Sequence, residues 1–419
     1  MYLKALVDRN LIFVSQRGTN GNVKSYSIHD LLRDLCVRKA REEKFLFIYS
    51  QADDDLRRSI SSFCRLCYHG PFSIVDSSTS MEQIRLARSL LLFNGIEKQV
   101  RPPMFSELRL LRVLDISSQS SWQLEEILQL VNLRYLALTV YQSLPSSISR
   151  LCNLQTLFAR HGGSSFYYGN NLFVIPGILD MPELRHIKFK GRRTYVEYHG
   201  EDKNRFVVLD KLQTLSPIAI SQLTDKVLET LPNLEELGIL WDKEVDHVID
   251  LSRLHKLHTL KCTTFKYDRR GNLLSNLIFP PSLNKLTLGR FAIMDHHMNE
   301  IGKLPNLQTL KLRRCFFRSG KWEVEDGEFC RLQFLLMEDL SLVNWAADDT
   351  HFPRLEHLVI RLCDRLKEIP LAIGDIPTLK VIEVYKCSPS VAASARGIQE
   401  AQLDIGNEDL QVRILEENK

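Results

Sequence analysis

Apolar residues recur along most of the chain with one spacing. An apolar position is followed by a second three residues later, a third after three more and a fourth after two more, as in Leu130, Leu133, Leu136 and Leu138. Copies follow one another at intervals of mostly 21 to 26 residues. We recognise twelve copies, whose first apolar residues are Leu108, Leu130, Leu151, Met181, Leu209, Leu231, Leu254, Leu304, Phe329, Phe352 and Ile376, with Leu283 the second position of a copy that lacks the first.

The last step of the pattern, two residues, is the period of one face of a short β-strand. Leucine-rich amphipathic helices would keep to steps of three and four residues, so the final step argues against them. A unit of this length cannot bury its apolar face alone, whereas stacked copies form a continuous core. The pattern therefore predicts an α/β solenoid, a leucine-rich-repeat horseshoe with a parallel β-sheet on its concave face.

Two features describe the segments between the strands. Leu144–Ile148 and Ile369–Ile373 both read apolar-Pro-x-x-Ile, and proline suits an irregular convex segment because it cannot pair in a central strand. Cys315, Cys363 and Cys387 each come three residues after the last apolar position of their copy. We expect these cysteines to be buried packing residues in the turn; a metal or redox role is the alternative.

The repeats set the predicted domain boundaries. The stretch Arg88–Phe93 reads as an atypical first repeat, so the repeat domain is expected over residues 84–390. Residues 51–83, which contain the acidic run Asp53–Asp55, are expected to be a linker. Residues 391–419 are expected to be a cap and tail, with a helix over Val391–Glu400 that covers the last face of the core.

The first fifty residues have a different pattern. Leu11–Val14 and Val23–Ile28 read as two strands, and Asn20-Gly21 between them is a strong hairpin signal. Apolar residues then recur at steps of three and four over His29–Glu43, which predicts an amphipathic helix. A strand pair followed by a helix predicts that residues 1–50 are the end of a winged-helix domain.

These N-terminal elements resemble a known family. The stretches Leu6–Ile12, Ile28–Cys36, Arg88–Phe93 and Leu111–Ile116 are similar to plant intracellular NB-LRR immune receptors of the coiled-coil class, and in particular to late blight resistance protein homologues. The resemblance covers nearly the whole chain. It implies the final part of such a receptor, beginning inside the winged-helix domain.

The resemblance also implies a nucleotide-switch role for two residues. Ile28-His29-Asp30 matches the "MHD" motif of the family, whose histidine lies near the ADP phosphate and whose aspartate helps to hold the inactive state. No G-x-x-x-x-G-K-[ST] phosphate loop is present. We therefore expect no cofactor in this chain, and ADP or ATP at His29 and Asp30 only with an upstream nucleotide-binding domain. The alternative is structural, with Asp30 favouring the helix dipole by up to ~1 kcal/mol and His29 packing between wing and helix.

Composition narrows the function classes. The 419 residues carry 55 basic and 51 acidic side chains, a net charge of +4, which argues against a nucleic-acid binder. The nine scattered cysteines are typical of a reduced interior, and no signal peptide or membrane-length apolar run is present. We therefore expect a cytoplasmic protein without an integral membrane segment.

Other candidate chemistry is weak. Cys64, Cys67 and His69 resemble the start of a zinc site, but no second ligand pair lies nearby. Asp295-His296-His297 is expected to be a solvated loop. With no convincing nucleophile or acid–base pair, we do not expect an enzyme.

The candidate binding surface follows from the strand pattern, because outward strand positions form the concave surface that solenoids use for binding. Many of these positions are basic or aromatic, and such residues are frequent at binding hot spots. We expect them to dock an acidic partner; a solvated sheet face without a partner is the alternative. The candidates are Tyr135, Phe158, Arg160, Lys188, Lys190, Lys261, Lys285, Lys311, Arg313, Phe334, Arg361 and Tyr385, with His186 beside them.

The family resemblance implies the partners. They are the receptor's own nucleotide-binding domain or other immune receptors, which the repeats would hold inactive, and a pathogen effector or a guarded host protein. The alternative function is a stand-alone adaptor or scaffold without nucleotide switching, such as a ubiquitin-ligase substrate receptor. An adaptor of that kind would need an F-box-like helical module at its N-terminus, which the strand pair and the His-Asp helix argue against.

Overall fold

The computed structural model describes residues 2–17, 23–50, 62–69, 84–93, 105–118, 124–162, 181–191, 207–265 and 273–415. The chain forms two compact units. Unit 1 comprises residues 1–16 and 23–218, and unit 2 comprises residues 17–22 and 219–419. The Asn20-Gly21 turn and the Asp53–Asp55 run lie outside the described residues.

Unit 1 begins with the elements that the first fifty residues predict. Helix α1 (Tyr2–Asp8) is followed by strands β1 (Ile12–Arg17) and β2 (Val23–Ile28), which pair in a two-stranded sheet, and by helix α2 (Asp30–Glu42). None of the residues in α1 or α2 is buried. The predicted strand pair and helix are confirmed, whereas the winged-helix assignment stays a prediction.

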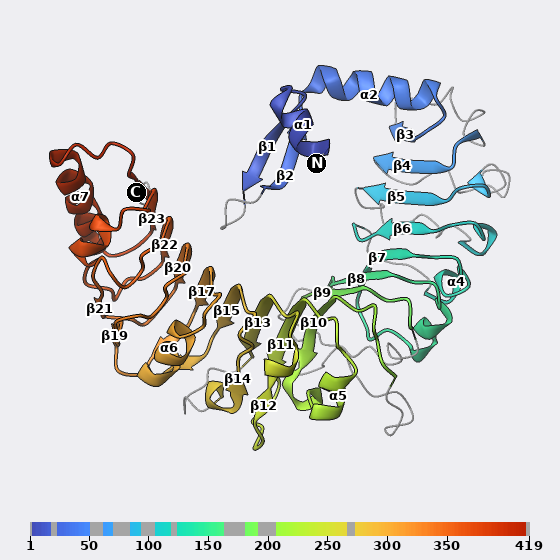
Figure 1. Ribbon diagram of the computed structural model, residues 1–419. Helices are drawn as coiled ribbons and strands as arrows, with labels where there is room; N and C mark the ends of the chain where they lie inside the picture. Colours follow the sequence, from blue (N-terminus) through green and yellow to red (C-terminus); the bar gives the residue numbers. More distant parts are fainter. Residues whose placement is uncertain are drawn as a thin grey trace. The chain divides into compact units, whose positions relative to one another are not determined.

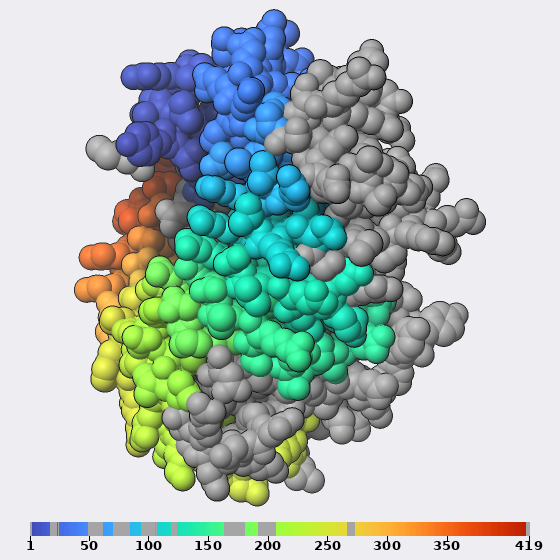
Figure 2. All heavy atoms as spheres, turned by 90° about the vertical axis from the view of Figure 1, so that its right-hand side faces the viewer, coloured from blue at the N-terminus to red at the C-terminus, as the bar shows by residue number. Residues whose placement is uncertain are grey.

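The rest of unit 1 is a parallel sheet in which each strand pairs with the next one along the chain (Figure 1). Its strands are β3 (Phe47–Ser50), β4 (Arg65–His69), β5 (Ser89–Phe93), β6 (Val113–Ile116), β7 (Tyr135–Val140), β8 (Thr156–His161), β9 (His186–Lys190) and β10 (Thr214–Ala219). The register aligns Leu90, Leu114, Leu136 and Leu157 in one buried row. In Figure 2 the repeats of this unit form consecutive bands from blue to green.

Unit 2 repeats the arrangement. Its parallel strands are β11 (Glu236–Trp241), β13 (Thr259–Thr264), β15 (Lys285–Gly289), β17 (Thr309–Arg313), β20 (Phe334–Glu338), β22 (His357–Arg361), β23 (Val381–Tyr385) and β24 (Gln411–Leu415). Leu260, Leu286, Leu310 and Leu335 are in register and buried. The predicted leucine-rich-repeat solenoid with a parallel sheet is thus confirmed.

The first step of the sequence pattern is a hydrogen-bonded turn. The backbone N–H of Leu133 donates to the carbonyl of Leu130 at 2.9 Å, and that of Leu154 donates to the carbonyl of Leu151 at 2.9 Å. A turn closed between residues i and i+3 brings both side chains to one side. Every core position that the pattern predicts is buried except Leu304, which is half-buried.

Helices, most of them short, and strands of two or three residues connect the sheet strands on the other side of the core. In unit 1 they are η3 (Phe105–Glu107), α4 (Leu124–Ile127) and η4 (Ser146–Arg150). In unit 2 they are η6 (Ile220–Gln222), α5 (Asp225–Glu229), β12 (Ile249–Asp250), η7 (Leu251–Arg253), η8 (Leu274–Asn276), β14 (Leu277–Ile278), β16 (Ala292–Ile293), α6 (Asp295–Gly302), β18 (Phe316–Phe317), β19 (Lys321–Glu323), β21 (Asn344–Ala346), η9 (Leu371–Asp375) and α7 (Pro389–Asp404). The two proline-bearing stretches form η4 and η9, as expected for irregular segments.

The domain boundaries differ from the predicted ones at both ends. The sheet begins at β3, inside residues 1–50, and continues through β4, so residues 51–83 are not wholly a linker. At the other end α7 confirms the predicted helix, but the tail adds β24, whose Val412 pairs with Ile382. Strands β4 and β24 continue the rows of core residues but lack the leucine spacing, which is why the sequence pattern did not reveal them.

An aromatic cluster fills the core of unit 2 behind the sheet. The Trp322 and Trp345 rings stack with centroids 5.7 Å apart, and Phe352 meets both at steep angles. Trp322 and Trp345 are cross-strand partners in the β19–β21 pair. The outer layer of these repeats is therefore held by ring packing as well as by backbone hydrogen bonds.

The chain leaves consecutive strands of unit 2 through a residue with left-handed backbone. For Leu362, φ is 53°, and its N–H donates to the carbonyl of Tyr385 on the next strand at 2.9 Å. A non-glycine residue in this region costs about 1–2 kcal/mol, and the cross-strand hydrogen bond holds it there. Equivalent residues are Arg290, Arg314, Asp339 and Lys386.

Replacing Leu362 should change stability according to backbone preference. Leu362 is 41% exposed, so its side chain contributes little burial. We expect Leu362→Gly to raise the free energy of unfolding by about 0.5–1 kcal/mol and Leu362→Val to lower it by about 1 kcal/mol, because a β-branched residue fits φ > 0 worst. Urea unfolding followed by tryptophan fluorescence measures both; a destabilised glycine variant would contradict the strain at this position.

Candidate protein-binding surface

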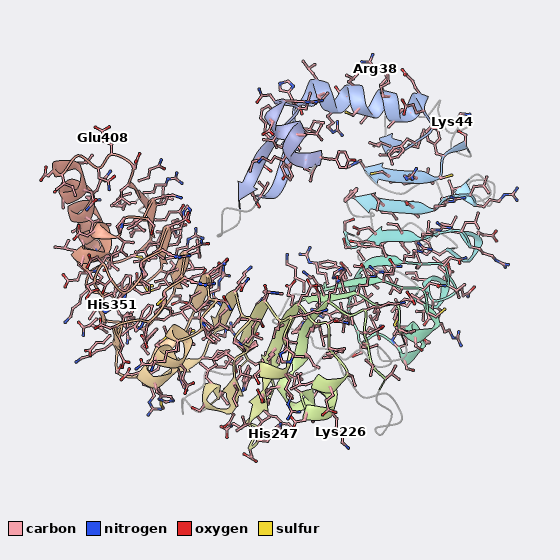
Figure 3. All side chains as sticks on the ribbon, viewed as in Figure 1. Arg38, Lys44, Lys226, His247, His351 and Glu408 are labelled. Carbon is pink, nitrogen blue, oxygen red and sulfur yellow. The ribbon has the colours of Figure 1, made fainter. Side chains whose placement is uncertain are left out.

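The strand register in unit 2 divides the sheet face opposite the leucine core into three rows. We call this side the sheet face; side chains project from both sides of the strand layer (Figure 3). The first row is Glu236, Thr259, Lys285, Thr309, Phe334, His357, Val381 and Gln411. The middle row is Gly238, Lys261, Thr287, Lys311, Leu336, Val359, Glu383 and Arg413, and the third is Leu240, Thr263, Gly289, Arg313, Glu338, Arg361, Tyr385 and Leu415.

All candidate binding residues of unit 2 lie on these rows. They are Lys285 and Phe334 in the first row, Lys261 and Lys311 in the middle row, and Arg313, Arg361 and Tyr385 in the third. Because a strand alternates its side chains between two faces, a single register places them together.

The candidates of unit 1 lie on the same face of their own sheet. Tyr135 is in register with Thr156 and His186, and Phe158 is in register with Lys188. Arg160 and Lys190 are also cross-strand partners. Arg160, Lys188 and Lys190 are exposed, whereas Tyr135 and Phe158 are half-buried.

Lys261 is the centre of a basic cluster on the unit 2 face. Partial burial of its ammonium lowers the pKa of Lys261; Arg313 and Lys285 lower it further by repulsion, while Glu236 opposes them. A cation held among other cations favours an anionic neighbour. This cluster gathers cations from β13, β15 and β17 on the sheet face.

Two of the candidates are buried, which corrects the expectation that the whole set faces a partner. Phe334 is 5% exposed and Lys311 is 9% exposed, and the Lys311 Nζ lies 5.3 Å above the centre of the Phe334 ring. Phe334 also clusters with Leu336 and Val359, at 3% and 5% exposure. These residues pack among themselves on the sheet face, because three large side chains stand in neighbouring positions of the register.

Two other candidates are paired with carboxylates. The Arg313 Nε lies 3.5 Å from Glu338, and the Arg361 guanidinium lies 3.3 Å from Glu383. Glu383 is also 3.6 Å from Arg413. Sequence reasoning missed these carboxylates because each ion pair joins residues from different repeats. The pairs reduce the positive charge at β17–β23, whereas none of the ion pairs within the described residues involves Lys261 or Lys285.

The candidate nucleotide-switch residues lie at the start of α2. His29 is the N-cap residue, and its Nδ1 accepts a hydrogen bond from the N–H of Leu31 at 3.3 Å. Asp30 occupies the first turn, and both side chains are exposed. This geometry shows the capping role, while nucleotide contact stays a prediction.

The turn cysteines are packing residues. Cys315 and Cys363 are buried, and their thiols approach the carbonyls of Leu288 and Met337 in the preceding repeat at 3.6 and 3.7 Å. Burial raises the pKa of each thiol to about 12, so both stay protonated at neutral pH. Cys387 makes the equivalent contact with Ile360 at 3.6 Å but is only half-buried.

The Cys64–His69 segment gives no metal site in the described part of the chain. The Cys67 thiol lies 3.5 Å from the His69 Nε2, and burial raises the pKa of Cys67. Among the residues with described positions, no group of three or more histidine, cysteine or carboxylate side chains converges as metal ligands would.

The Asp295–His297 segment is not the solvated loop that we expected. These residues begin α6, and His297 is only 2% exposed. Its Nδ1 accepts a hydrogen bond from the Met294 N–H at 3.2 Å, and its Nε2 lies 2.9 Å from the Ser275 hydroxyl of the preceding repeat. Burial, and to a lesser extent His296, lowers the pKa of His297 to about 4. The neutral ring is thus part of the core.

Acidification should destabilise unit 2 through His297. The unfolded side chain binds a proton near pH ~6.5, but the folded one only near pH 4, so stability is full above ~6.5 and is lost as the pH falls toward 4. We expect a loss of roughly 2–3 kcal/mol between pH ~7 and ~4.5 from this group. Urea unfolding at both pH values measures it.

His297→Gln is the matched control, because glutamine retains an acceptor for the Met294 N–H without titrating. Its loss of stability over the same pH interval should be smaller than that of the wild-type chain. Equal losses would show that His297 does not cause the pH dependence.

The chain matches a family model described as a leucine-rich repeat region over residues 86–295. Putative late blight resistance protein homolog R1B-16 of Solanum demissum is 34% identical over 421 residues, which cover 96% of this chain and 32% of that protein. A second putative late blight resistance protein homolog of the same species is 32% identical over 427 residues, which cover 96% of this chain and 53% of that protein. The predicted similarity to late blight resistance protein homologues is confirmed, and the chain spans about a third to a half of the length of these two relatives.

One solved structure shows the same fold. The crystal structure of the internalin inlF from Listeria monocytogenes aligns with 88% of this chain and 96% of that chain, at a TM-score of 0.53 and 14% sequence identity. This likeness supports the solenoid fold alone. Among the described residues, no helix has the length and apolar character needed to cross a membrane.

Proposed function

The chain belongs to the leucine-rich repeat family, and on that basis we propose that it recognises protein partners through the sheet face in plant disease resistance. The observation that carries the proposal is the position of Lys261 and Lys285 on neighbouring strands of the sheet face, where Lys261 also meets the repulsion of Arg313. An acidic protein surface would relieve that repulsion on binding.

The partners that we propose follow from the relatives' names. Two late blight resistance protein homologues are similar to this chain over nearly all of its length. We propose that the sheet face binds the remainder of such a receptor in the resting state, and a pathogen effector or guarded host protein on activation. Competition for one basic face would link recognition to release of autoinhibition.

A nucleotide role for His29 and Asp30 is part of the same proposal. Both side chains are exposed, and the His29 Nδ1 is used in capping, which leaves Nε2 available to a phosphate oxygen. In a receptor with a nucleotide-binding domain, ADP contact at His29 would report the nucleotide state to the repeats. The chemistry would come from that other domain, and this chain would act by binding.

Reversing the charge of the basic cluster should weaken the resting-state complex. The partner to use is the remainder of homolog R1B-16, produced as a separate protein. We expect Lys261→Glu with Lys285→Glu to weaken binding by at least about tenfold, since removing attraction and adding repulsion at two close contacts costs about 1–3 kcal/mol. Calorimetric titration at two salt concentrations measures the affinity, and the wild-type affinity should fall as salt rises.

Lys243→Glu with Lys303→Glu is the control, because both side chains are exposed and lie outside the three rows of the sheet face. This variant changes net charge by the same amount and should bind as the wild-type chain does. Equal weakening by the two double variants, or binding insensitive to both, would contradict recognition through the sheet face. Absence of any complex would favour the adaptor function.

A further inference from the structure

A second surface of unit 1 carries charge that neither the core nor the sheet face uses. Arg88, Arg112 and Arg134 each stand immediately before a sheet strand, at the start of β5, β6 and β7. The Arg112 N–H donates to the carbonyl of Arg88 at 2.8 Å, and the Arg134 N–H donates to the carbonyl of Arg112 at 2.7 Å. The three arginines are therefore stacked one above another. We call each position immediately before a sheet strand a rung. All three rung arginines are exposed.

Exposed aliphatic side chains accompany these arginines. Leu86, Leu110 and Val131 are 51%, 46% and 48% exposed, and they stand two or three residues before the rung arginines in the same turns. The same turns contribute two further exposed arginines. We call the set the rim patch: Arg85, Leu86, Arg88, Arg109, Leu110, Arg112, Val131 and Arg134.

The rim patch as defined contains five arginines and no acidic residue. Within the part of the chain that the structure describes, no carboxylate forms an ion pair with any of its arginines. The equivalent rungs of unit 2 differ: Glu356 and Lys380 stand before β22 and β23, and their charged atoms lie 2.8 Å apart. The hydrogen bonds between Arg88, Arg112 and Arg134 use only backbone atoms, which leaves the exposed guanidinium groups accessible to a partner.

The rung spacing indicates the shape of a partner. Neighbouring strands are ~4.8 Å apart, whereas a helix advances ~5.4 Å per turn and alternate residues of an extended chain are ~6.7 Å apart. Over two steps a helix departs from the rungs by about 1 Å and an extended strand by about 4 Å. An arginine side chain can accommodate the first difference more easily than the second.

We propose that the rim patch binds an acidic amphipathic α-helix of a partner protein, with one carboxylate per turn aligned on Arg88, Arg112 and Arg134. Arginine pairs with carboxylates in a bidentate manner, which fixes direction as well as charge. Leucine-like side chains beside the acidic column cover Leu86, Leu110 and Val131. This surface is separate from the sheet face and from the partners proposed for it.

A designed peptide tests the proposal directly. The probe is a fluorescein-labelled helix of about 20 residues with one glutamate per turn on one face and leucines beside that column. Fluorescence anisotropy with the full chain should show binding that falls at least about tenfold in Arg112→Glu with Arg134→Glu, because two bidentate contacts are lost. Arg150→Glu with Lys243→Glu is the matched control: both side chains are exposed outside the rim patch, the change of net charge is the same, and this variant should bind normally.

A second peptide of the same composition, with its glutamates spread around the helix, separates alignment from net charge. Phosphatidylserine vesicles and single-stranded RNA of about 20 nucleotides, tested on the same variants, separate a helix from other anionic partners. Preference for the aligned peptide supports the proposal. Equal binding of both peptides, or dependence on Arg112 and Arg134 for vesicles or RNA but not for the aligned peptide, overturns it. Circular dichroism checks the fold of each variant, and Arg112→Gln replaces the double variant if that unfolds.

Discussion

The in-register pairing of parallel strands is the constraint on which the structure depends. One register per repeat directs two residues of each strand into the core and the residues between them to the sheet face. It also stacks identical positions of neighbouring repeats about 4.8 Å apart, so a residue type that recurs in sequence becomes a row in space. The leucine rows, the cysteine turns, the Lys261–Lys285 cluster and the rim arginines are all products of this alignment.

The sequence predicted the fold well where leucine occupies the core positions, because steps of three, three and two residues are typical of a turn that leads into a short strand. It failed where other apolar residues take those places. The strand Arg65–His69 buries Leu66 and Tyr68 without the preceding leucine turn, and Gln411–Leu415 lies in a charged tail. Each of these two segments becomes a strand because it pairs with a neighbouring strand of the sheet. The sequence of a single segment does not reveal that pairing.

The sequence predicted where the candidate binding residues lie, but not which of them are buried or paired with carboxylates. Strand alternation placed every candidate residue on the sheet face. Burial of Lys311 against Phe334 and pairing of Arg361 with Glu383 depend on which residue stands on the next strand, some 22 residues away. The rim patch was missed for a related reason: its residues precede the strands, outside the positions considered for binding, and their charge becomes notable only when Arg88, Arg112 and Arg134 are stacked.

Lysine reactivity tests recognition through the sheet face most directly. The chain is acetylated with a limiting reagent, alone and in complex with the remainder of homolog R1B-16, and the modification of each lysine is read by mass spectrometry. Recognition through the sheet face predicts that Lys261 and Lys285 become protected in the complex while Lys226, on α5 in the outer layer (Figure 3), keeps its reactivity. Unchanged reactivity of Lys261 and Lys285 in a complex that demonstrably forms would contradict it.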